Sequence, residues 1–512
     1  MRLSLPAIAL LALSASAGAQ FRLEETTIAE VHAAFRGGRL SCHDLVAQYL
    51  RRIDAYDKKG PAINAIIIVN PDALKTADSL DARYKTERRL VGPLHCVPMI
   101  VKDNFETRDL PTSDGSLAFQ GFISDKDATQ VRRIREAGAV VLAKSNMAEF
   151  AFTPFETVSS ILPGYTKNPY ALDRVTAGSS GGTAAAVAAN MGESGLGTDT
   201  GNSIRGPSSH QALVGIRSTM GLTSRAGVAP LSYAADIAGP MARSVADAVA
   251  IFQVVAGFDP DDPVTEPART RPLPDYSQSL VKDGLRNARI GILRQAYERP
   301  TTDTEIVAVF TRATADLRRS GATVIDSVPT PELDSIFRVQ RDPCNRFKYD
   351  LEKWIASTGN RTPVKTLDEI VRSRRFHPSV QVRLEAAQRA TAPPDSQPGC
   401  AQVEELRRDV RRVLGAAMDR LQLDAVVYPT WSNPPRLIGD LNTPAGDNSQ
   451  VFSPLTGWPA VQVPMGYTRG SLPAGMTILG RAWSEPTLFK FAYAFEQATH
   501  HRRPPPSAPP LR

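Results

Sequence analysis

The fold is constrained most by a regular alternation of helical and β-type patterns in the first part of the chain. Helical patterns cover residues 27–57, 72–85 and 127–137, and short β-forming runs cover residues 64–69, 98–101 and 139–143. Strands that alternate with helices are typical of α/β proteins with parallel strand pairs. The sequence therefore predicts an α/β fold with a substantially parallel sheet.

Length and composition limit the classes of protein that remain. The 512 residues leave room for roughly two to four average domains, or for one large α/β body. Hydrophobic residues make up 42% of the chain, which excludes a mostly disordered protein. The net charge is +7, and no clustered basic run lies on a predicted helix. We therefore expect no nucleic-acid partner.

The N-terminus has the order of a secretory signal peptide. Met1-Arg2 supplies a positive start, residues 3–13 are mostly apolar, and Ala17-Gly18-Ala19 provides a small-residue cleavage site. The alternative is a membrane anchor, but a spanning helix needs roughly 20 apolar residues and this run is much shorter. We expect residues 1–19 to be removed by cleavage after Ala19. The mature protein would then be secreted or periplasmic, without membrane contact.

Export permits disulfides, and the four cysteines of the chain can form up to two. Cys344 and Cys400 flank the same poorly patterned region, so we expect them to pair, while Cys42 and Cys96 are left without an assigned partner. None of the spacings resembles a CxxC metal site, so no metal is expected.

The second half of the chain has weaker patterns. β-type runs are predicted at residues 289–293, 322–325 and 424–427, and helices at residues 303–319 and 485–499. Ser41 and Asp303 are expected as helix N-caps. Residues 330–400 show weak periodicity, and we expect variable, substrate-facing structure there. The Pro-rich residues 501–512 are predicted to be a disordered tail.

Two loops rich in Gly and Ser are the candidate sites of a nucleophile. The first serine loop (residues 178–182, Gly-Ser-Ser-Gly-Gly) precedes an apolar helical run at residues 183–189, and the second serine loop covers residues 197–205. Ser179 and Ser203 lie 24 residues apart, which is enough for a helix and a return strand to bring them together. Either loop alone is commonplace.

The first serine loop also fits G-x-S-x-G, the nucleophile elbow of α/β-hydrolases, with Ser180 at its centre. That motif requires a buried strand immediately before it, and residues 168–174 do not have such a pattern. A histidine base would have to come from His210, His377, His500 or His501. The elbow is therefore the poorer hypothesis.

Lys102 is a candidate base that needs no histidine. It ends the apolar run at residues 98–101, and strand alternation directs the side chain of Asp103 to the opposite face. A lysine that is desolvated and lacks a carboxylate partner has a lowered pKa and acts as a base. The alternative is an ordinary surface lysine.

Three separated segments together resemble the amidase signature family. Residues 92–104 are similar to its lysine motif, residues 178–182 to its Gly/Ser motif, and residues 197–205 to its nucleophile motif. Further similarity, strongest to secreted bacterial peptide amidase-like members, covers most of residues 25–500 and leaves 330–400 unmatched. The resemblance implies one large domain over residues 20–500, with a mixed, largely parallel sheet covered by helices on both faces.

The resemblance also implies catalytic roles. Ser203 would be the nucleophile, Ser179 the bridging serine after a cis peptide bond, and Lys102 the base. Other roles follow from the same motifs: an oxyanion hole of Thr200, Gly201, Asn202 and Ser203, substrate-binding Ser180 and Thr198, and loop-fixing Asp199 and Arg205. Asn202, Cys96 and Ala177 replace glycines that are common in the family. None of these changes removes a member of the triad.

The expected activity is hydrolysis of a carboxamide to a carboxylate and ammonia or an amine, without a cofactor, through an acyl-enzyme on Ser203. The substrate would be a small-molecule or peptide amide, and the protein a monomer or homodimer. Alternatives are a serine esterase or carbamate hydrolase and a non-catalytic binding protein on the same fold. A component of the machinery that forms amidated tRNA is a further possibility, which the signal peptide disfavours.

Overall fold

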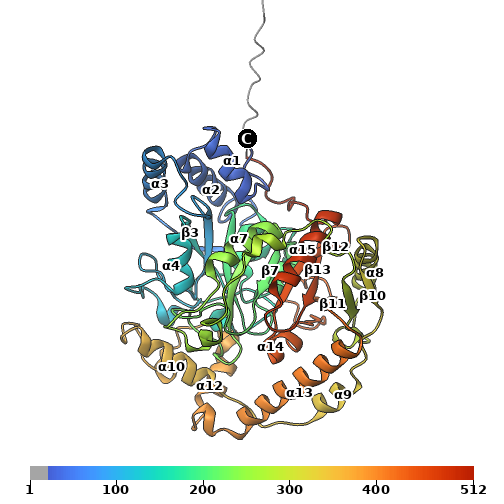
Figure 1. Ribbon diagram of the computed structural model, residues 1–512. Helices are drawn as coiled ribbons and strands as arrows, with labels where there is room; N and C mark the ends of the chain where they lie inside the picture. The colour runs from blue at the N-terminus through green and yellow to red at the C-terminus, as the bar shows by residue number, and fades with distance from the viewer. Residues whose placement is uncertain (1–20, 512) are drawn as a thin grey trace, which may run out of the picture.

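The computed structural model describes residues 21–511, which form one α/β body around an eleven-stranded sheet (Figure 1). The predicted signal peptide lies outside the described residues. The strand order across the sheet is β1-β3-β2-β6-β8-β7-β12-β13-β11-β9-β10. The strands of this sheet are β1 (Ile66–Val69), β2 (Pro98–Lys102), β3 (Val140–Ser145), β6 (Ser194–Asp199), β7 (Val214–Arg217), β8 (Ile237–Ala242), β9 (Arg289–Ile292), β10 (Thr323–Ile325), β11 (Ala425–Pro429), β12 (Ala460–Thr468) and β13 (Leu472–Leu479).

The sheet is mixed, as expected, and its parallel pairs are confined to two blocks. β3, β2 and β6 form one parallel block, and β11, β9 and β10 form the other. Between them, β8, β7, β12 and β13 run antiparallel to their neighbours. The sequence patterns identified strands of the parallel blocks and missed this antiparallel middle.

Helices cover the sheet on both faces. The α-helices of the described residues are α1 (Ile28–Arg36), α2 (Cys42–Tyr56), α3 (Ala73–Glu87), α4 (Thr129–Glu136), α5 (Gly181–Ala188), α6 (Arg205–His210), α7 (Val245–Val255), α8 (Thr304–Arg319), α9 (Pro331–Arg338), α10 (Phe347–Ser357), α11 (Leu367–Ser373), α12 (Gln381–Gln388), α13 (Pro398–Arg420), α14 (Phe452–Thr456) and α15 (Glu485–Thr499). Helix α7 contacts α4 on one side and α15 on the other, and α15 in turn contacts α8. In Figure 1, α7 and α15 cross the front of the sheet. Helices α5 and α6 pack together in a separate layer.

Strand β2 shows how the alternation of side chains places the candidate base. Met99 and Val101 pack in one hydrophobic cluster with residues of α4 and α7, whereas Ile100 packs in another with residues of α2 and α5. Because successive side chains of a strand point to opposite faces, Lys102 lies on the same face as Ile100. That face is the one toward α5 and the first serine loop.

Residues 330–400, which had weak periodicity, fold mainly as helices. Helices α9 to α12 lie here, and in Figure 1 α10, α12 and α13 line the edge of the molecule opposite the N-terminal helices. Cys344 and Cys400 form a disulfide, as expected, that ties the segment before α10 to the first turn of α13. A second disulfide joins Cys42 on α2 to Cys96 before β2.

The C-terminal segment differs from the predicted disordered tail. Arg52 on α2 donates hydrogen bonds to the carbonyls of Ala508 (2.8 Å) and Pro509 (3.0 Å), and Tyr56 donates one to Pro509 (2.6 Å). Ala508 is buried in the hydrophobic cluster of α2 and α5. The prolines therefore shape a segment that packs beside α1 and α2, where Figure 1 marks the C-terminus. Among the described residues, no helix combines the length and the apolar character needed to cross a membrane.

Candidate active site

Lys102 is held at the end of β2 in a fully buried position. Its Nζ donates hydrogen bonds to the Ser179 hydroxyl at 2.7 Å and to the Thr198 hydroxyl at 2.6 Å. Thr198 lies on β6, the parallel neighbour of β2, and its hydroxyl also accepts a hydrogen bond from the Asn104 amide at 3.2 Å. Both oxygens bonded by Lys102 are hydroxyls, and the amine contacts no carboxylate within ion-pair distance among the described residues.

Burial controls the protonation of this amine. Loss of solvation lowers the pKa of Lys102 from 10.5 to about 7, against the opposing effect of the carboxylates of Asp114, Asp236 and Asp199. The neighbouring Asp103 carboxylate does not oppose the shift, because it accepts hydrogen bonds from the Ser113 and Gly115 amides and lies 3.6 Å from the Lys144 amine. A substantial fraction of Lys102 is therefore neutral near neutral pH, as a base requires.

The first serine loop presents Ser179 to Lys102 at the start of α5. The Gly178–Ser179 peptide bond is cis, as the resemblance implied. A side chain at Gly178 would collide with the carbonyl oxygens of Thr153 and Glu156, and one at Gly182 would collide with the backbone of Asn146. The glycines therefore allow the loop to pack closely between neighbouring backbone segments.

The second serine loop connects β6 to α6 and lies against the first. The Ser180 amide donates a hydrogen bond to the Ser203 carbonyl at 3.3 Å, which holds the two loops in contact. Ser203, Thr200 and Gly201 line a cavity of about 710 Å³, and Ser203 is 5% exposed. Of the three serines in the two loops' contact region, Ser179, Ser180 and Ser203, it is Ser203 that lines a substrate-sized cavity.

The backbone of the second serine loop has unused hydrogen-bond donors. Within residues 21–511, the N–H groups of Gly201, Asn202 and Ser203 donate to no other group. The N–H group of Thr200 likewise donates to no group among these residues, and its hydroxyl donates to the Asp236 carboxylate at 2.5 Å. Free amides beside a serine that lines a cavity provide the donors of an oxyanion hole.

A buried ion-pair cluster fixes the shape of this loop. The Asp199 carboxylate lies 3.0 Å from the Arg205 guanidinium and 3.1 Å from that of Arg217, and Arg205 also donates to the Gly201 carbonyl at 2.6 Å. Burial alone would raise the pKa of Asp199, but the two arginines outweigh it and lower that pKa to about 2. Asp199 and Arg205 thus occupy the loop-fixing positions expected for them.

The site contains carboxylates that sequence reasoning missed. Asp114 is fully buried, neither of its carboxylate oxygens has a hydrogen-bond partner among the described residues, and burial raises its pKa well above the usual range. It and Asp236, whose pKa burial raises to about 6, act on Lys102 through space. Both lie in loops without periodic patterns, so nothing in the local sequence placed them near Lys102.

No histidine takes the place that the nucleophile elbow requires within the part of the chain that the structure describes. The Ser180 hydroxyl donates to the Thr198 carbonyl at 3.2 Å, and β5 (Ala171–Val175), before the first serine loop, belongs to a separate two-stranded sheet with β4 (Lys167–Asn168). The buried His210 ring stacks on Trp431, and burial lowers its pKa to about 3. His377 pairs with the Ser379 hydroxyl at 2.7 Å. The structure brings Lys102 together with the two serine loops and leaves these histidines aside.

The large α/β body buries a lysine between two serine loops, and its similarity to known amidases identifies it as an amidohydrolase acting on amides. The chain belongs to the Amidase family, whose model matches residues 44–489 and includes the amidase signature enzymes. It is 33% identical to a probable amidase of Arabidopsis thaliana over 95% of this chain and 92% of that protein. It is also 34% identical to a component chain of the glutamyl-tRNA(Gln) amidotransferase of Moorella thermoacetica, over 91% of this chain and 95% of that one.

Among solved structures, the chain is similar to the native peptide amidase of Stenotrophomonas maltophilia. The TM-score is 0.83 at 37% identity, over 94% of this chain and 98% of that chain. Residues 330–400 matched none of the motifs. They nevertheless lie within a fold that this chain shares with the peptide amidase over almost its whole length.

Proposed function

We propose that the protein hydrolyses peptide amides through a relay of Lys102, Ser179 and Ser203. The observation that carries this proposal is the hydrogen bond from the buried Lys102 amine to Ser179, in contact with the loop that holds Ser203. The lowered pKa of Lys102 supports its role as the base. The unused amides of Thr200, Gly201, Asn202 and Ser203 support an oxyanion hole beside the nucleophile.

In the proposed reaction, neutral Lys102 accepts the Ser179 proton while Ser179 accepts the Ser203 proton. The Ser203 oxygen then forms a bond to the carbonyl carbon, and the negative charge on the carbonyl oxygen is stabilised by the loop amides. When the C–N bond breaks, the proton returns through the same relay to the leaving nitrogen. Water, deprotonated by that relay, hydrolyses the Ser203 ester and releases the carboxylate.

The cavity and the relatives favour a peptide amide over a smaller substrate. The space at Ser203 measures about 710 Å³, much more than an aliphatic amide of a few atoms fills. The similar solved structure from Stenotrophomonas maltophilia is that of a peptide amidase. The experiment is a panel of peptide C-terminal amides, anilides, esters and carbamates at equal substrate concentration, with release of ammonia, arylamine or alcohol measured. Preferred turnover of esters or carbamates with no ammonia from peptide amides would refute the proposal.

The pH dependence of kcat/KM tests the base. Protonated Lys102 has no lone pair, so its pKa of about 7 predicts that kcat/KM rises about tenfold per pH unit below neutrality and levels off above it. Asp236 also titrates in the site, with a pKa of about 6, so an Asp236→Asn variant serves as the control and should keep the rise. A profile that is flat from pH 5 to 9 would contradict the role of Lys102.

Export of the protein is also proposed, since the N-terminal pattern lies outside the described residues. The two disulfides support it, because disulfides persist mainly in oxidising compartments. N-terminal sequencing of the protein from its native host should give Gln20 as the first residue; retention of Met1 would oppose it.

A further inference from the structure

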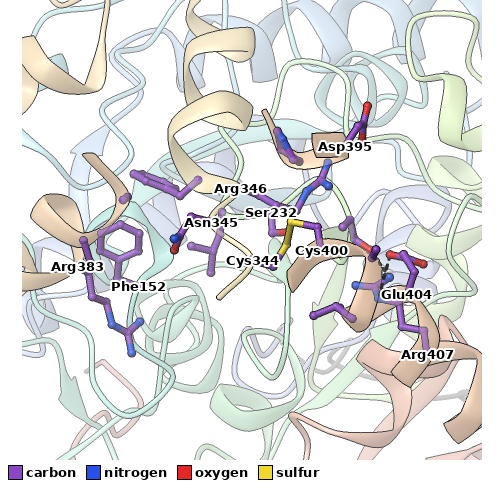
Figure 2. Close-up of a pocket in the computed structure, with 18 residues that line it drawn as sticks. Phe152, Ser232, Cys344, Asn345, Arg346, Arg383, Asp395, Cys400, Glu404 and Arg407 are labelled. Carbon is purple, nitrogen blue, oxygen red and sulfur yellow. Dashed lines mark hydrogen bonds and ion pairs between the residues drawn. A yellow bond between two sulfur atoms is a disulfide. The ribbon is translucent and has the colours of Figure 1, made fainter. Parts of the chain in front are cut away.

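A second cavity adjoins the one at Ser203. It measures about 690 Å³ and is walled by the Cys344–Cys400 disulfide, α12 and the start of α13 (Figure 2). Phe152, Leu231, Arg383 and Arg407 line both cavities. The two cavities are therefore adjacent, and the second lies on the side of the helical segment at residues 330–400, where we expected substrate-facing structure.

Of the two arginines that line both cavities, Arg383 is the one without a polar partner among the described residues. It forms no ion pair or hydrogen bond with residues 21–511, and its guanidinium lies 5.9 Å from the centre of the Phe152 ring. The Arg383 side chain is exposed at the rim of the cavities, where partial loss of solvation lowers its pKa, although it stays a cation at any physiological pH. A guanidinium held on an aromatic face at the rim of a cavity is suited to bind a carboxylate.

The other arginines that line the second cavity are engaged by their own neighbours. Arg407 donates to the Ala234 carbonyl at 2.7 Å and lies 3.5 Å from Glu404. Arg346 lies 3.4 Å from Asp350. Arg383 is thus the guanidinium of this cavity that is left available for a ligand.

The carboxylates of the two cavities lie away from Arg383 or are held by other groups. Figure 2 places Arg383 and Phe152 at one end of the second cavity, and Asp395 and Glu404 toward the other. Asp447 lines the cavity at Ser203, where it accepts a hydrogen bond from the Ser449 amide at 2.9 Å. None of these carboxylates forms an ion pair with Arg383 in the described structure. The positive charge of Arg383 is therefore not neutralised by a neighbouring carboxylate.

We propose that the second cavity holds the acyl-side residues of a peptide amide and that Arg383 selects a substrate carrying a carboxylate side chain there. This inference rests on the proposed function. An acidic residue of the bound peptide would form the ion pair that Arg383 lacks, whereas a bound neutral residue would displace water from that guanidinium without supplying an opposite charge.

The test uses N-acetylated hexapeptide amides that carry a single Glu or Gln at each of the four positions nearest the amide. For the position that reaches Arg383, we expect kcat/KM to favour Glu over Gln by about tenfold, which corresponds to about 1.4 kcal/mol. Arg383→Gln should bring this ratio close to one, and Arg383→Glu should reverse it. Arg389→Gln, at the end of the same helix and outside both cavities, should keep the wild-type ratio.

The outcomes separate this inference from the proposed function. Equal turnover of the Glu and Gln peptides at all four positions, or a preference that survives in Arg383→Gln, overturns the role of Arg383 while leaving peptide amide hydrolysis in place. Absence of ammonia from every peptide, with or without Glu, overturns both. High salt should reduce the preference for Glu, because the ion pair is partly exposed to solvent.

Discussion

Replacement of Ser203 by alanine should abolish amide hydrolysis, with a loss in kcat on the order of 10⁶-fold. The reason is that Ser203 would form the only covalent bond to the substrate, and the neighbouring Ser179 is bound by Lys102 at 2.7 Å as part of the relay. Residual turnover would come from the loop amides and from binding alone. Ammonia release from a peptide amide, followed over hours at high enzyme concentration, measures the loss.

Ser209→Ala is the matched control for this variant. Ser209 lies on α6, a short distance along the chain from Ser203, and its buried hydroxyl has no hydrogen-bond partner among the described residues. Ser209→Ala also removes one serine hydroxyl from this region, but not the hydroxyl of the nucleophile. Thermal stability should therefore change little, and activity should persist. Ser203→Ala activity within tenfold of this control would contradict the assignment of the nucleophile.

Lys102→Met should lower kcat/KM by about 10²–10⁴-fold, the usual contribution of a general base. Methionine fills a similar volume and removes the amine, so Ser179 loses its proton acceptor while the packing at the end of β2 is retained. The rise of activity with pH should disappear in this variant, because the group that titrates near 7 is gone. A purely structural lysine would lower activity without changing the shape of the pH profile.

Histidine variants provide the comparison for Lys102. His210→Phe keeps an aromatic ring against Trp431, and His377→Ala removes a partly buried ring that bonds only its own turn within the described residues. His500→Ala and His501→Ala remove the remaining candidates of the nucleophile elbow. All four should retain activity within a few-fold of wild type. A loss in any of them that matches Lys102→Met would revive the histidine mechanism.

The sequence was most informative where local patterns decide the structure. The last helix was expected at residues 485–499 and is observed as Glu485–Thr499, and Ser41 and Asp303 cap α2 and α8 through their side chains as expected. The apolar run before Lys102 became β2 because strands of this kind are buried on both faces. The return strand expected between Ser179 and Ser203 is β6.

The antiparallel middle of the sheet was missed in part because three of its four strands contain a proline, which usually opposes strand formation. Pro240 lies in β8, Pro464 in β12 and Pro473 in β13, and proline cannot donate to a strand ladder. These strands form because long-range pairing and burial outweigh local preference. The C-terminal tail was misjudged for the same reason, since its prolines pack against α2 through contacts that only the fold creates.

The candidate site was predictable in part. Motif resemblance placed Lys102, Ser179 and Ser203, and the structure brings their loops together. Asp114 and the cavity beside Arg383 were not predictable, because each depends on segments far apart in the sequence that meet only in the folded chain. Their local sequences carry no pattern of spacing that indicates a site.

The central claim, that Ser203 is the nucleophile, is tested most directly by a fluorophosphonate probe followed by peptide mapping. Such probes form a stable adduct with an activated serine, and the modified residue is identified by mass spectrometry. We predict one adduct, on Ser203, that is absent from Ser203→Ala and strongly reduced in Lys102→Met. An adduct on Ser180, or no adduct on the wild-type protein that hydrolyses amides, would contradict the mechanism.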